Sequence, residues 1–413
     1  MKKSAGPSVA LSMSKLALRM GEGVNLALQE RILDEVRVSG SDLSGALAAR
    51  GLSYDDLRYQ VSDELAWSGP RPLKLEEYTA RPRSGRFVSF FTGCGGVDLG
   101  FEAAGLQHDA SFEINELFCK TLRRNRPSWH VFGPPVHSGD VSNHEEIVEA
   151  LSGVISTPYD GVFVGGPPCQ PFSIAANQRF SKEGANFKRI GFGHERNGNL
   201  LFNFVSLVQE FRPAVFMIEN VPGLRDIDGG AQLTAALGML KAVGYRVEEP
   251  MTLNAADFGI PQNRYRLFVV GSRLSRSFRA PKMAREHIGC GSVLPTTKFK
   301  ALNHDTREHK LESVLRYKRL YYGERDQLGR VDRLDPTLPS KTVIAGGVNG
   351  GGRSHLHPEI PRTLSVRECA RLQTFPDDYA FIGPTARQFT QVGNAVPPLL
   401  AAQMGSALIK SYL

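Results

Sequence analysis

The sequence is poor in cysteine. Its 413 residues include only five, Cys94, Cys119, Cys169, Cys290 and Cys369, and no two of them form a CxxC pair. Structural zinc sites and disulfide frameworks need clustered or paired cysteines. The scattered positions argue against both, so we expect no metal site and a chain that works in the reduced state inside a cell.

Long apolar runs are missing as well. The sequence has no uninterrupted run of about 18 apolar residues, the length that crosses a bilayer. The N-terminal segment MKKSAGPSVALSMSKLALRM breaks its apolar residues with Ser, Lys and Arg, unlike a secretory signal. We therefore expect no membrane partner and a cytoplasmic protein.

Positive charge is concentrated in one segment. The chain has 50 Lys and Arg against 42 Asp and Glu, a net charge of +8, and residues 271–361 alone hold 17 basic and 9 acidic residues. Elsewhere the charges balance at 33 of each sign. A solvated surface is one interpretation. Interleaving with Tyr317, Tyr321 and Tyr322 and the run GGVNGGGRSH favours contact with a phosphate backbone.

Residues 1–84 are predicted to form a helical N-terminal extension and linker. Segments 25–37 and 39–65 have apolar residues at helical spacing, with Ser and Asp at capping positions. Residues 71–86 have the prolines and charges of a linker. A packing or oligomerisation element is favoured over a helix-turn-helix, for which the signal is weak.

From Phe87 onward, apolar runs alternate with helical patterns. FVSFF, YDGVFV, AVFMIE and YRLFVVG are typical of buried parallel strands, and residues 201–211 and 231–244 of crossover helices. This order predicts a doubly wound α/β (Rossmann-like) domain over 85–271, completed by 391–413. Residues 272–390 are expected to form a smaller, irregular or β-rich domain.

A glycine-rich turn, FFTGCGG (90–96), follows the first expected strand and precedes a helix start. Glycines at such a turn let the backbone approach a ligand closely. About twenty residues on, Glu113 ends the next apolar run, where a carboxylate binds ribose hydroxyls in nucleotide folds. By itself the turn also allows a nicotinamide site or no ligand.

Cys169 lies between prolines in GGPPCQPFS (165–173), directly after an expected buried strand. A thiol at a strand exit is placed to act as a nucleophile. A single cysteine is more often an inert buried residue. What favours catalysis is the order of the surrounding blocks, which are FVSFFTGCGGVDLGFEAAG, ASFEIN, GPPCQPFS, FMIENVPG, IPQNRYRLF, RTLSVRECARLQTFPDDY and QVGNAVPPLLA.

In these blocks, their order and their spacing, the sequence resembles the DNA cytosine-5 methyltransferase family. The resemblance extends from Phe87 to the C-terminus, apart from about 272–361. It implies S-adenosylmethionine as cofactor. The residues that match the family's cofactor site are Phe91, Gly93, Gly95, Gly96, Glu113, Asp140, Pro168, Leu200 and Asn394.

The resemblance also implies the catalytic groups. Cys169 matches the nucleophile that attacks cytosine C6, and Glu219 the residue that contacts N3 and N4 of the base. Arg264 and Arg266, on alternate positions of an expected strand and so on one face, match the pair near the cytosine O2, the catalytic loop and the DNA phosphate. A surface ion pair is the alternative for the arginines.

The implied partner is double-stranded DNA. The target atom is inaccessible in a duplex, so the reaction requires base flipping, and residues 175–199 resemble the family's closing loop. The basic segment, with TVIAGG (342–347), lies where the family reads its target. Bacterial members commonly accompany a restriction endonuclease, so we expect a nucleoid-associated enzyme that protects host DNA, with an orphan regulatory methylase as the alternative. Members often act as monomers, and we expect a monomer here.

Three rival functions remain at this point. A tRNA cytosine methyltransferase shares the PPCQPF and ENV motifs, although the N-terminal extension and the basic segment fit duplex DNA better. A non-catalytic DNA-binding protein of this fold would not need all of Cys169, Glu219, Arg264, Arg266 and Asn394. A Rossmann oxidoreductase would leave GPPCQPFS unexplained.

Overall fold

The computed structural model describes residues 26–60, 69–77, 84–168, 200–294, 301–345 and 355–413. The chain forms two compact units. Unit 1 comprises Met1–Pro72, Ile288–Leu372 and Pro384–Gly393, and unit 2 comprises Leu73–His287, Gln373–Gly383 and Asn394–Leu413. This division differs from the sequence-based boundaries, because residues 272–287 belong to unit 2, and residues 1–72 belong to the same unit as residues 288–372.

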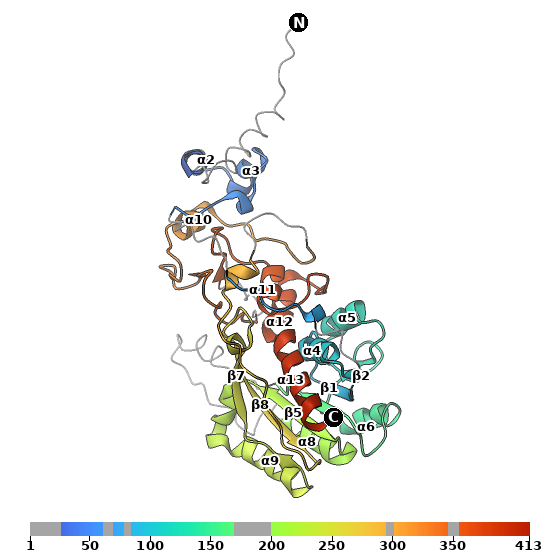
Figure 1. The fold of residues 1–413 in the computed structure, drawn as a ribbon. Helices are drawn as coiled ribbons and strands as arrows, with labels where there is room; N and C mark the ends of the chain where they lie inside the picture. Colours follow the sequence, from blue (N-terminus) through green and yellow to red (C-terminus); the bar gives the residue numbers. More distant parts are fainter. Residues whose placement is uncertain (1–25, 61–68, 78–83, 169–199, 295–300, 346–354) are drawn as a thin grey trace. The chain divides into compact units, whose positions relative to one another are not determined.

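Unit 2 is built on an eight-stranded sheet (Figure 1). The strand order is β3-β2-β1-β4-β5-β8-β6, and β7 also pairs with β8. The bounds are β1 Arg86–Phe90, β2 Gln107–Phe112, β3 Val131–Phe132, β4 Val162–Gly165, β5 Val215–Asn220, β6 Arg246–Val247, β7 Met251–Asn254 and β8 Tyr265–Ser272. Strands β1 to β5 are parallel, which confirms the doubly wound α/β fold.

Strand β8 departs from the prediction. It runs antiparallel to β5, with Glu219 opposite Phe268 and Asn220 opposite Leu267, and β6 and β7 also pair with it in antiparallel fashion. The prediction that YRLFVVG is a parallel strand was wrong. A strand buried on both faces is apolar throughout, so its sequence carries no sign of its direction.

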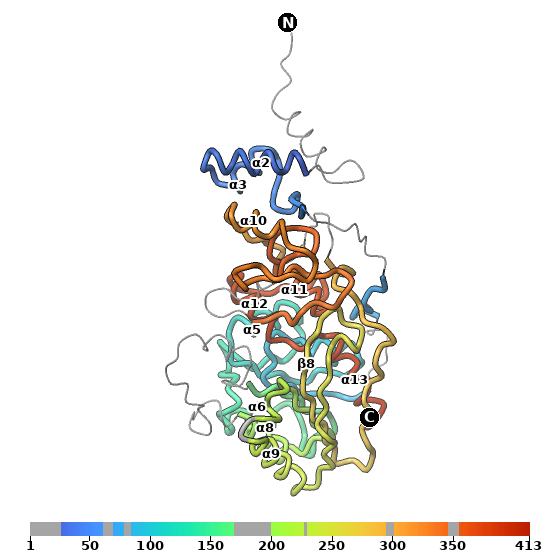
Figure 2. The backbone as a smooth tube through the Cα atoms, turned by 90° about the vertical axis from the view of Figure 1, so that its left-hand side faces the viewer, coloured from blue at the N-terminus to red at the C-terminus, as the bar shows by residue number. Residues whose placement is uncertain are grey.

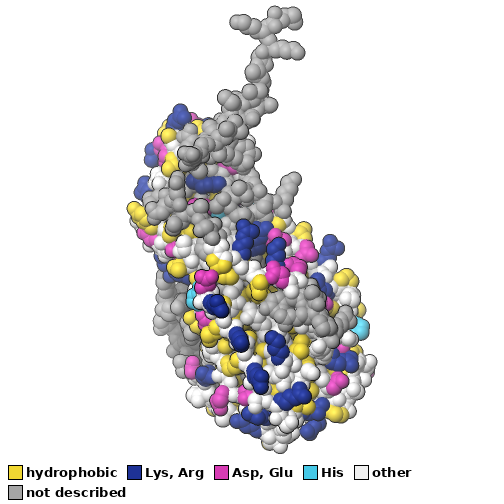
Figure 3. Space-filling view, viewed as in Figure 1, with side chains coloured by type: hydrophobic (Ala, Val, Ile, Leu, Met, Phe, Trp, Pro, Cys, Tyr) yellow, Lys and Arg dark blue, Asp and Glu magenta, His cyan; other side chains and the backbone are white. Residues whose placement is uncertain are grey.

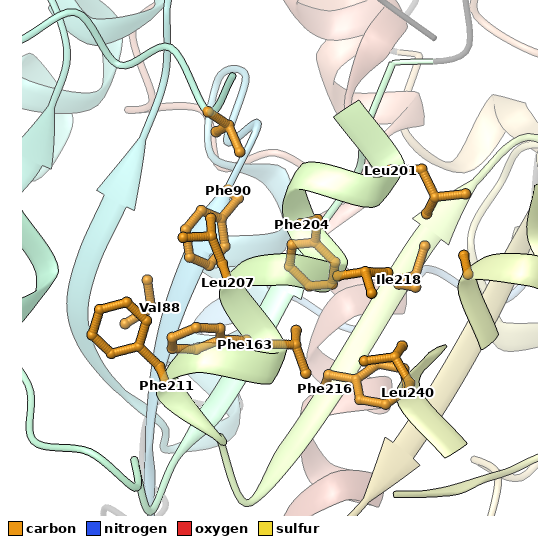
Figure 4. Packing of buried hydrophobic residues seen from close by; sticks show 14 of the residues in the cluster. Val88, Phe90, Phe163, Leu201, Phe204, Leu207, Phe211, Phe216, Ile218 and Leu240 are labelled. Atoms are coloured by element: carbon orange, nitrogen blue, oxygen red, sulfur yellow. The ribbon is translucent and has the colours of Figure 1, made fainter. Parts of the chain in front are cut away.

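Helices cover both faces of the sheet, because alternate residues of each strand point to opposite sides. The helices of unit 2 are α4 Gly96–Ala104, α5 Glu116–Asn125, α6 His144–Ser152, α8 Leu200–Phe211, α9 Ala231–Ala242 and α13 Pro398–Tyr412. On one face, Phe163 of β4 and Phe216 of β5 pack against α8 and α9 (Figure 4). On the other, Val162 and Met217 pack against α4 and α13.

Helices α4 and α13 are in close contact through glycine. A Cβ at Gly96 would lie 2.2 Å from the Val396 carbonyl oxygen, and one at Gly100 would lie 2.4 Å from that of Pro398. Any side chain at either position would force the helices apart. The glycines of the GGVDLGFE block therefore form the turn before α4 and also allow α13 to pack closely against α4.

One helical stretch of the described residues, Thr385–Tyr412, is long and apolar enough to cross a membrane by length and composition, which the sequence did not lead us to expect. Of its most apolar window, 83% is buried. The stretch comprises two helices, α12 Thr385–Asn394 and α13. Burial of this kind is typical of a core helix.

Unit 1 has short elements and a small apolar core. Its helices are α2 Leu26–Ser39, α3 Leu43–Ala48, α10 Leu311–Tyr317 and α11 Val366–Leu372, together with most of α12. The only strands described in this unit are β9 Asp332–Arg333 and β10 His355–Leu356, which pair in parallel. Of the two predictions for the basic segment, irregular structure describes these residues better than β-rich structure.

The N-terminal extension packs against the basic segment. Leu33 and Val36 of α2 and Leu43 of α3 share an apolar cluster with Val314 of α10. The Tyr54 hydroxyl donates to the His309 carbonyl at 2.8 Å. Helices α2 and α3 of the extension are therefore part of the apolar core of unit 1, in agreement with the packing alternative for these helices.

Several charged and aromatic residues of the basic segment are structural. The Arg333 guanidinium lies between the rings of Tyr59 and Tyr322, at 3.7 and 4.0 Å from their centroids. Lys318 is buried and pairs with Glu30 of α2. Tyr317 is also buried. Tyr317, Lys318 and Arg333 are therefore enclosed within unit 1 and do not contact phosphate, whereas Tyr321 is exposed and its contact with a phosphate backbone stays a prediction.

Candidate active site

The carboxyl ends of the parallel strands bring two sequence blocks together. Glu219 and Asn220 end β5, and the chain leaving the adjacent β4 continues through Gly166 and Pro167. The Asn220 side-chain amide donates to the Pro167 carbonyl at 2.9 Å. A Cβ at Gly166 would lie 2.9 Å from Oε2 of Glu219. In this fold, ligands bind at this edge of the sheet.

Glu219 pairs with Arg266. Nε of Arg266 lies 2.9 Å from Oε1 of Glu219, and the two side chains are 12% and 14% exposed. Burial raises the pKa of Glu219, against the opposing charges of Arg266 and Arg264. A carboxyl group with a raised pKa holds a proton more readily, which suits a hydrogen-bond donor to a ring nitrogen.

Arg264 is fully buried and immediately precedes β8. Its backbone N–H donates to Oδ1 of Asn254 at 2.9 Å. Burial and the charge of Arg266 lower its pKa, while Glu219 opposes them. A guanidinium keeps its charge in proteins, so Arg264 adds a fixed positive charge beside Glu219.

The nucleophile predicted from the sequence, Cys169, lies outside the described residues, as does the predicted closing loop 175–199. Pro168 is the last described residue before it, and it is exposed. The other four cysteines are free and buried. Burial raises the pKa of the thiol of each, which makes a nucleophilic role for any of them unfavourable.

Glu113 forms a second buried carboxyl site at the same edge. Its Oε2 accepts from the Gly93 N–H and its Oε1 from the Asn115 N–H, both at 2.7 Å. Burial raises its pKa to about 7, and the backbone hydrogen bonds limit the rise. Glu113 thus ties the glycine turn to the end of β2 and has no cationic partner among these bonds.

Asp140 lies near Glu113 because the glycine before it, Gly139, packs against the Glu113 backbone. A Cβ at Gly139 or at Gly133 would lie 2.2 Å from the Glu113 carbonyl oxygen. Oδ1 of Asp140 accepts from the Ser142 N–H at 2.9 Å. The two acidic residues predicted to bind the cofactor are therefore brought to neighbouring positions of the sheet edge.

The glycine turn has room for a ligand. Gly93 has a φ of +60° and a Cβ there would meet no atom within 4 Å. Phe91, a half-buried residue, has a φ of 57°, which is strained for a side chain of its size. Gly95, with a φ of +81°, caps α4. The backbone at Gly93, whose N–H donates to Glu113, is therefore not covered by other described atoms, as close approach of a ligand requires.

Leu200 and Asn394 lie at helix ends. Leu200 is the buried first residue of α8, and Asn394 is the exposed last residue of α12. No described hydrogen bond joins either side chain to Glu113 or Asp140. Their role in a common pocket stays a prediction.

Tyr379 was missed by the sequence reasoning. Its hydroxyl donates to the Cys94 carbonyl at 2.7 Å, and its oxygen would lie 3.2 Å from a Cβ at Gly95. The hydrogen bond from Tyr379 holds the backbone of the glycine turn at Cys94. Its position at the end of the RECARLQTFPDDY block was the available signal, since the other blocks supply site residues.

The fold is that of an α/β enzyme built on a mostly parallel sheet, a class in which ligands bind at the carboxyl edge. The family model for C-5 cytosine-specific DNA methylases matches residues 85–410. The chain therefore belongs to the C-5 cytosine-specific DNA methylase family and is an enzyme of that family. The family and the fold imply S-adenosylmethionine as the methyl donor.

Individual relatives agree with this assignment. The type II methyltransferase M.Eco47II of Escherichia coli is 32% identical over an alignment of 417 residues, which covers 89% of this chain and 90% of that protein. M.PspPI, a type II methyltransferase of Psychrobacter sp. (strain TA137), is 30% identical over 365 residues, covering 81% and 82%.

Solved structures share the fold. An E. coli prophage protein described as a DNA modification methyltransferase has a TM-score of 0.64 at 24% identity, covering 79% of this chain and 99% of its own. The Entamoeba histolytica methyltransferase EhMeth has a TM-score of 0.55 at 14% identity, covering 79% and 98%. At these identities the likeness supports the fold alone.

Proposed function

We propose that this protein is the modification methyltransferase of a type II restriction-modification system, and that it methylates C5 of a flipped cytosine through a covalent bond from Cys169 to C6. The observation that carries the proposal is the Glu219–Arg266 pair beside the backbone that leads into Cys169. Relatives named as type II methyltransferases support the biological setting.

In the proposed mechanism, the Cys169 thiolate adds to C6 of the cytosine, because C5 is a poor nucleophile until electron density in the ring is raised. Negative charge then builds on the ring. Glu219, with its raised pKa, donates to N3, and Arg266 holds the carboxyl group in place. After C5 is methylated, loss of the C5 proton to a base expels the Cys169 thiolate and restores the aromatic ring.

S-adenosylmethionine supplies the methyl group when it is bound. Glu113 would hold the ribose hydroxyls and Asp140 the adenine amine, at the edge where Gly93 leaves open space. Phe91, Gly95, Gly96, Pro168, Leu200 and Asn394 are proposed to line the rest of this site. Cytosine flipping follows from the requirement that both C5 and C6 be reached.

We further propose that residues 272–390 contain the target recognition domain, that the enzyme acts as a monomer, and that a restriction endonuclease reads the same site. The position of residues 288–361, most of the basic segment, in unit 1 supports the first of these. Binding to DNA would place the enzyme at the nucleoid.

Bisulfite sequencing of plasmid DNA from cells that express the chain tests the proposal, with Cys169→Ala as the control. We expect unconverted cytosines in one short motif, and none with the variant. Conversion of every cytosine by a folded protein that binds S-adenosylmethionine would contradict it. Transfer of tritiated methyl to tRNA in place of DNA would identify the rival substrate.

A further inference from the structure

After β8 the chain turns back as an irregular segment, residues 273–287, which has bends at 273–276 and 285–286 and lies wholly in unit 2 (Figure 2). Its sequence, RLSRSFRAPKMAREH, places a basic residue at every third position. These are Arg273, Arg276, Arg279, Lys282 and Arg285. None of its residues belongs to a helix or a sheet strand.

A three-residue repeat has a geometric meaning in such a segment. In an extended helix of the polyproline type, three residues make one turn and rise about 9 Å, so every third side chain points the same way. A random distribution of charge in an exposed loop would scatter the cations around the chain. The stretch between the bends at 273–276 and 285–286 contains Arg279 and Lys282, and there the three-residue period favours a common direction.

The backbone of the segment is held in place. The Phe278 N–H donates to Oε1 of Glu248 at 3.1 Å, and the Arg279 N–H donates to Oγ of Ser411 at 2.9 Å. The Phe278 ring stacks on Tyr412 at 6.3 Å between centroids, and Leu274 packs on the same apolar cluster. The cations therefore project from a fixed support.

Four of the five cations have no partner among the residues that the structure describes. Arg273 donates to the carbonyls of Arg212 and Tyr159, which gives it a structural role. Within the described part of the chain, no hydrogen bond or ion pair engages the side chains of Arg276, Arg279, Lys282 or Arg285, and all four are exposed. Figure 3 shows Lys and Arg side chains gathered over the area where β8 and α13 lie in Figure 1.

The segment leads to the catalytic edge of the sheet. It starts after Ser272, which is paired with Val215 at the start of β5. Near its far end the Ala284 N–H donates to the carbonyl of Asp257, in the turn that follows β7. Asn254, the last residue of β7, pairs with Tyr265, next to Arg264 and Arg266.

We infer that Arg276, Arg279, Lys282 and Arg285 form a cationic track that binds the phosphate backbone of duplex DNA flanking the target site. The inference rests on the proposed function for its choice of polyanion. Unpaired cations at regular spacing along a fixed support match a regular array of phosphates, and each contact releases a condensed counterion. The track adds affinity independently of sequence, since phosphates carry no base information.

The test is the salt dependence of DNA binding by the full-length protein. The variant carries Arg276→Ser, Arg279→Ser, Lys282→Ser and Arg285→Ser, and leaves the anchors Leu274 and Phe278 intact. The control removes four exposed cations elsewhere by Arg31→Ser, Arg37→Ser, Lys120→Ser and Lys241→Ser. Affinity for a target duplex with long flanks is measured at several salt concentrations, and then for a duplex trimmed close to the target.

For the long duplex we expect the slope of log affinity against log salt to fall in magnitude by about 3 to 4 for the track variant, at about 0.9 per phosphate contact. The trimmed duplex should show a smaller change. The turnover number at saturating DNA and the affinity for S-adenosylmethionine should stay at the wild-type values.

An unchanged slope would overturn the track, and so would an equal fall in the control variant, which would show an effect of net charge alone. Failure of the wild-type protein to methylate any DNA would instead contradict the proposed function. The variants therefore test the cationic track, and the wild-type protein tests the proposed function.

Discussion

Two buried glutamates, one in each unit, differ in their hydrogen-bond partners and in the direction of their pKa shifts. The guanidinium of Arg362 in unit 1 donates two hydrogen bonds of 2.8 Å to the carboxylate of Glu368. Burial alone would raise its pKa, but the charge and hydrogen bonds of Arg362 lower it to about 2. Glu113 of unit 2 has backbone N–H groups as its described partners, and burial raises its pKa to about 7.

The difference agrees with a structural role for Glu368 and with the binding role proposed for Glu113. A carboxylate whose charge is fully matched inside the protein has little left to offer a ligand, and its role is to hold the fold together. A buried carboxyl group with a raised pKa lacks a matching charge in the protein, so hydrogen bonds from a ligand can stabilise its ionised form. Raised pKa values of carboxyl groups are for this reason common at binding sites. Glu113 and Glu219, both raised, lie at one sheet edge.

The largest effect is expected when the structural pair is broken. Glu368→Gln leaves the buried Arg362 with one fewer counter-charge and should lower the free energy of unfolding by about 3–5 kcal/mol. Chemical denaturation measures this, with Glu312→Gln, an exposed site on α10, as the matched control.

The effect of Glu368→Gln should depend on pH in a defined direction. The depressed pKa of Glu368 means that its stabilisation is present above the ordinary value of 4.5 and is lost as the pH falls towards about 2. The variant and the wild type should therefore converge at low pH. A constant difference from pH 7 to pH 2 would contradict the assignment of that stability to the ionised carboxylate.

Glu113 should show the opposite sign. Its raised pKa means that its contribution to folding stability is present below the ordinary value of 4.5 and is lost as the pH rises through about 7. The ionised form is the better acceptor for ribose hydroxyls, so affinity for S-adenosylmethionine should increase about tenfold between pH 6 and pH 8.

Calorimetric titration over this pH range checks the expectation, and Glu113→Gln should abolish the pH dependence. Glu116→Gln, which removes an exposed carboxylate three residues away, should leave it intact. A pH dependence that persists in Glu113→Gln would assign the titration to another group.

The smallest effect should come from a single hydroxyl in unit 1. The Tyr59 hydroxyl donates to the His357 carbonyl at 2.8 Å, while its ring packs on Arg333. Tyr59→Phe keeps the ring and should cost about 1 kcal/mol of stability, the value of one buried hydrogen bond. Tyr59→Ala also removes the ring and should cost more. Equal losses in the two variants would show that the ring contact on Arg333 adds nothing.

The sequence predicted unit 2 better than unit 1 for a physical reason. Strand and turn patterns such as FVSFF followed by TGCGG reflect local rules of burial and backbone conformation, and the structure follows them. The direction of β8 depends on which neighbour it pairs with, and an apolar run does not encode that. The ion pairs and ring contacts of unit 1 join residues far apart in sequence, such as Tyr59 and Arg333.

The same limit applies to the candidate site. Glu113, Glu219 and Arg266 were predictable because each lies at a strand end in a recognisable block. The support from Asn220 and Tyr379 was not, because it depends on which loops meet at the edge. Charge counting also misled, since it treats Lys318 and Arg333 as free surface cations although both are buried.

The division of the chain has a consequence for protein engineering. Unit 1 is assembled from three stretches of sequence, and the first of them supplies Tyr59, Asp55 and the helix α2 that the later stretches need as partners. A graft that transplants only the internal basic segment into a related enzyme would leave buried arginines facing a foreign surface. A transferable cassette must therefore be discontinuous, carrying residues 26–60 together with 288–372 and 384–393.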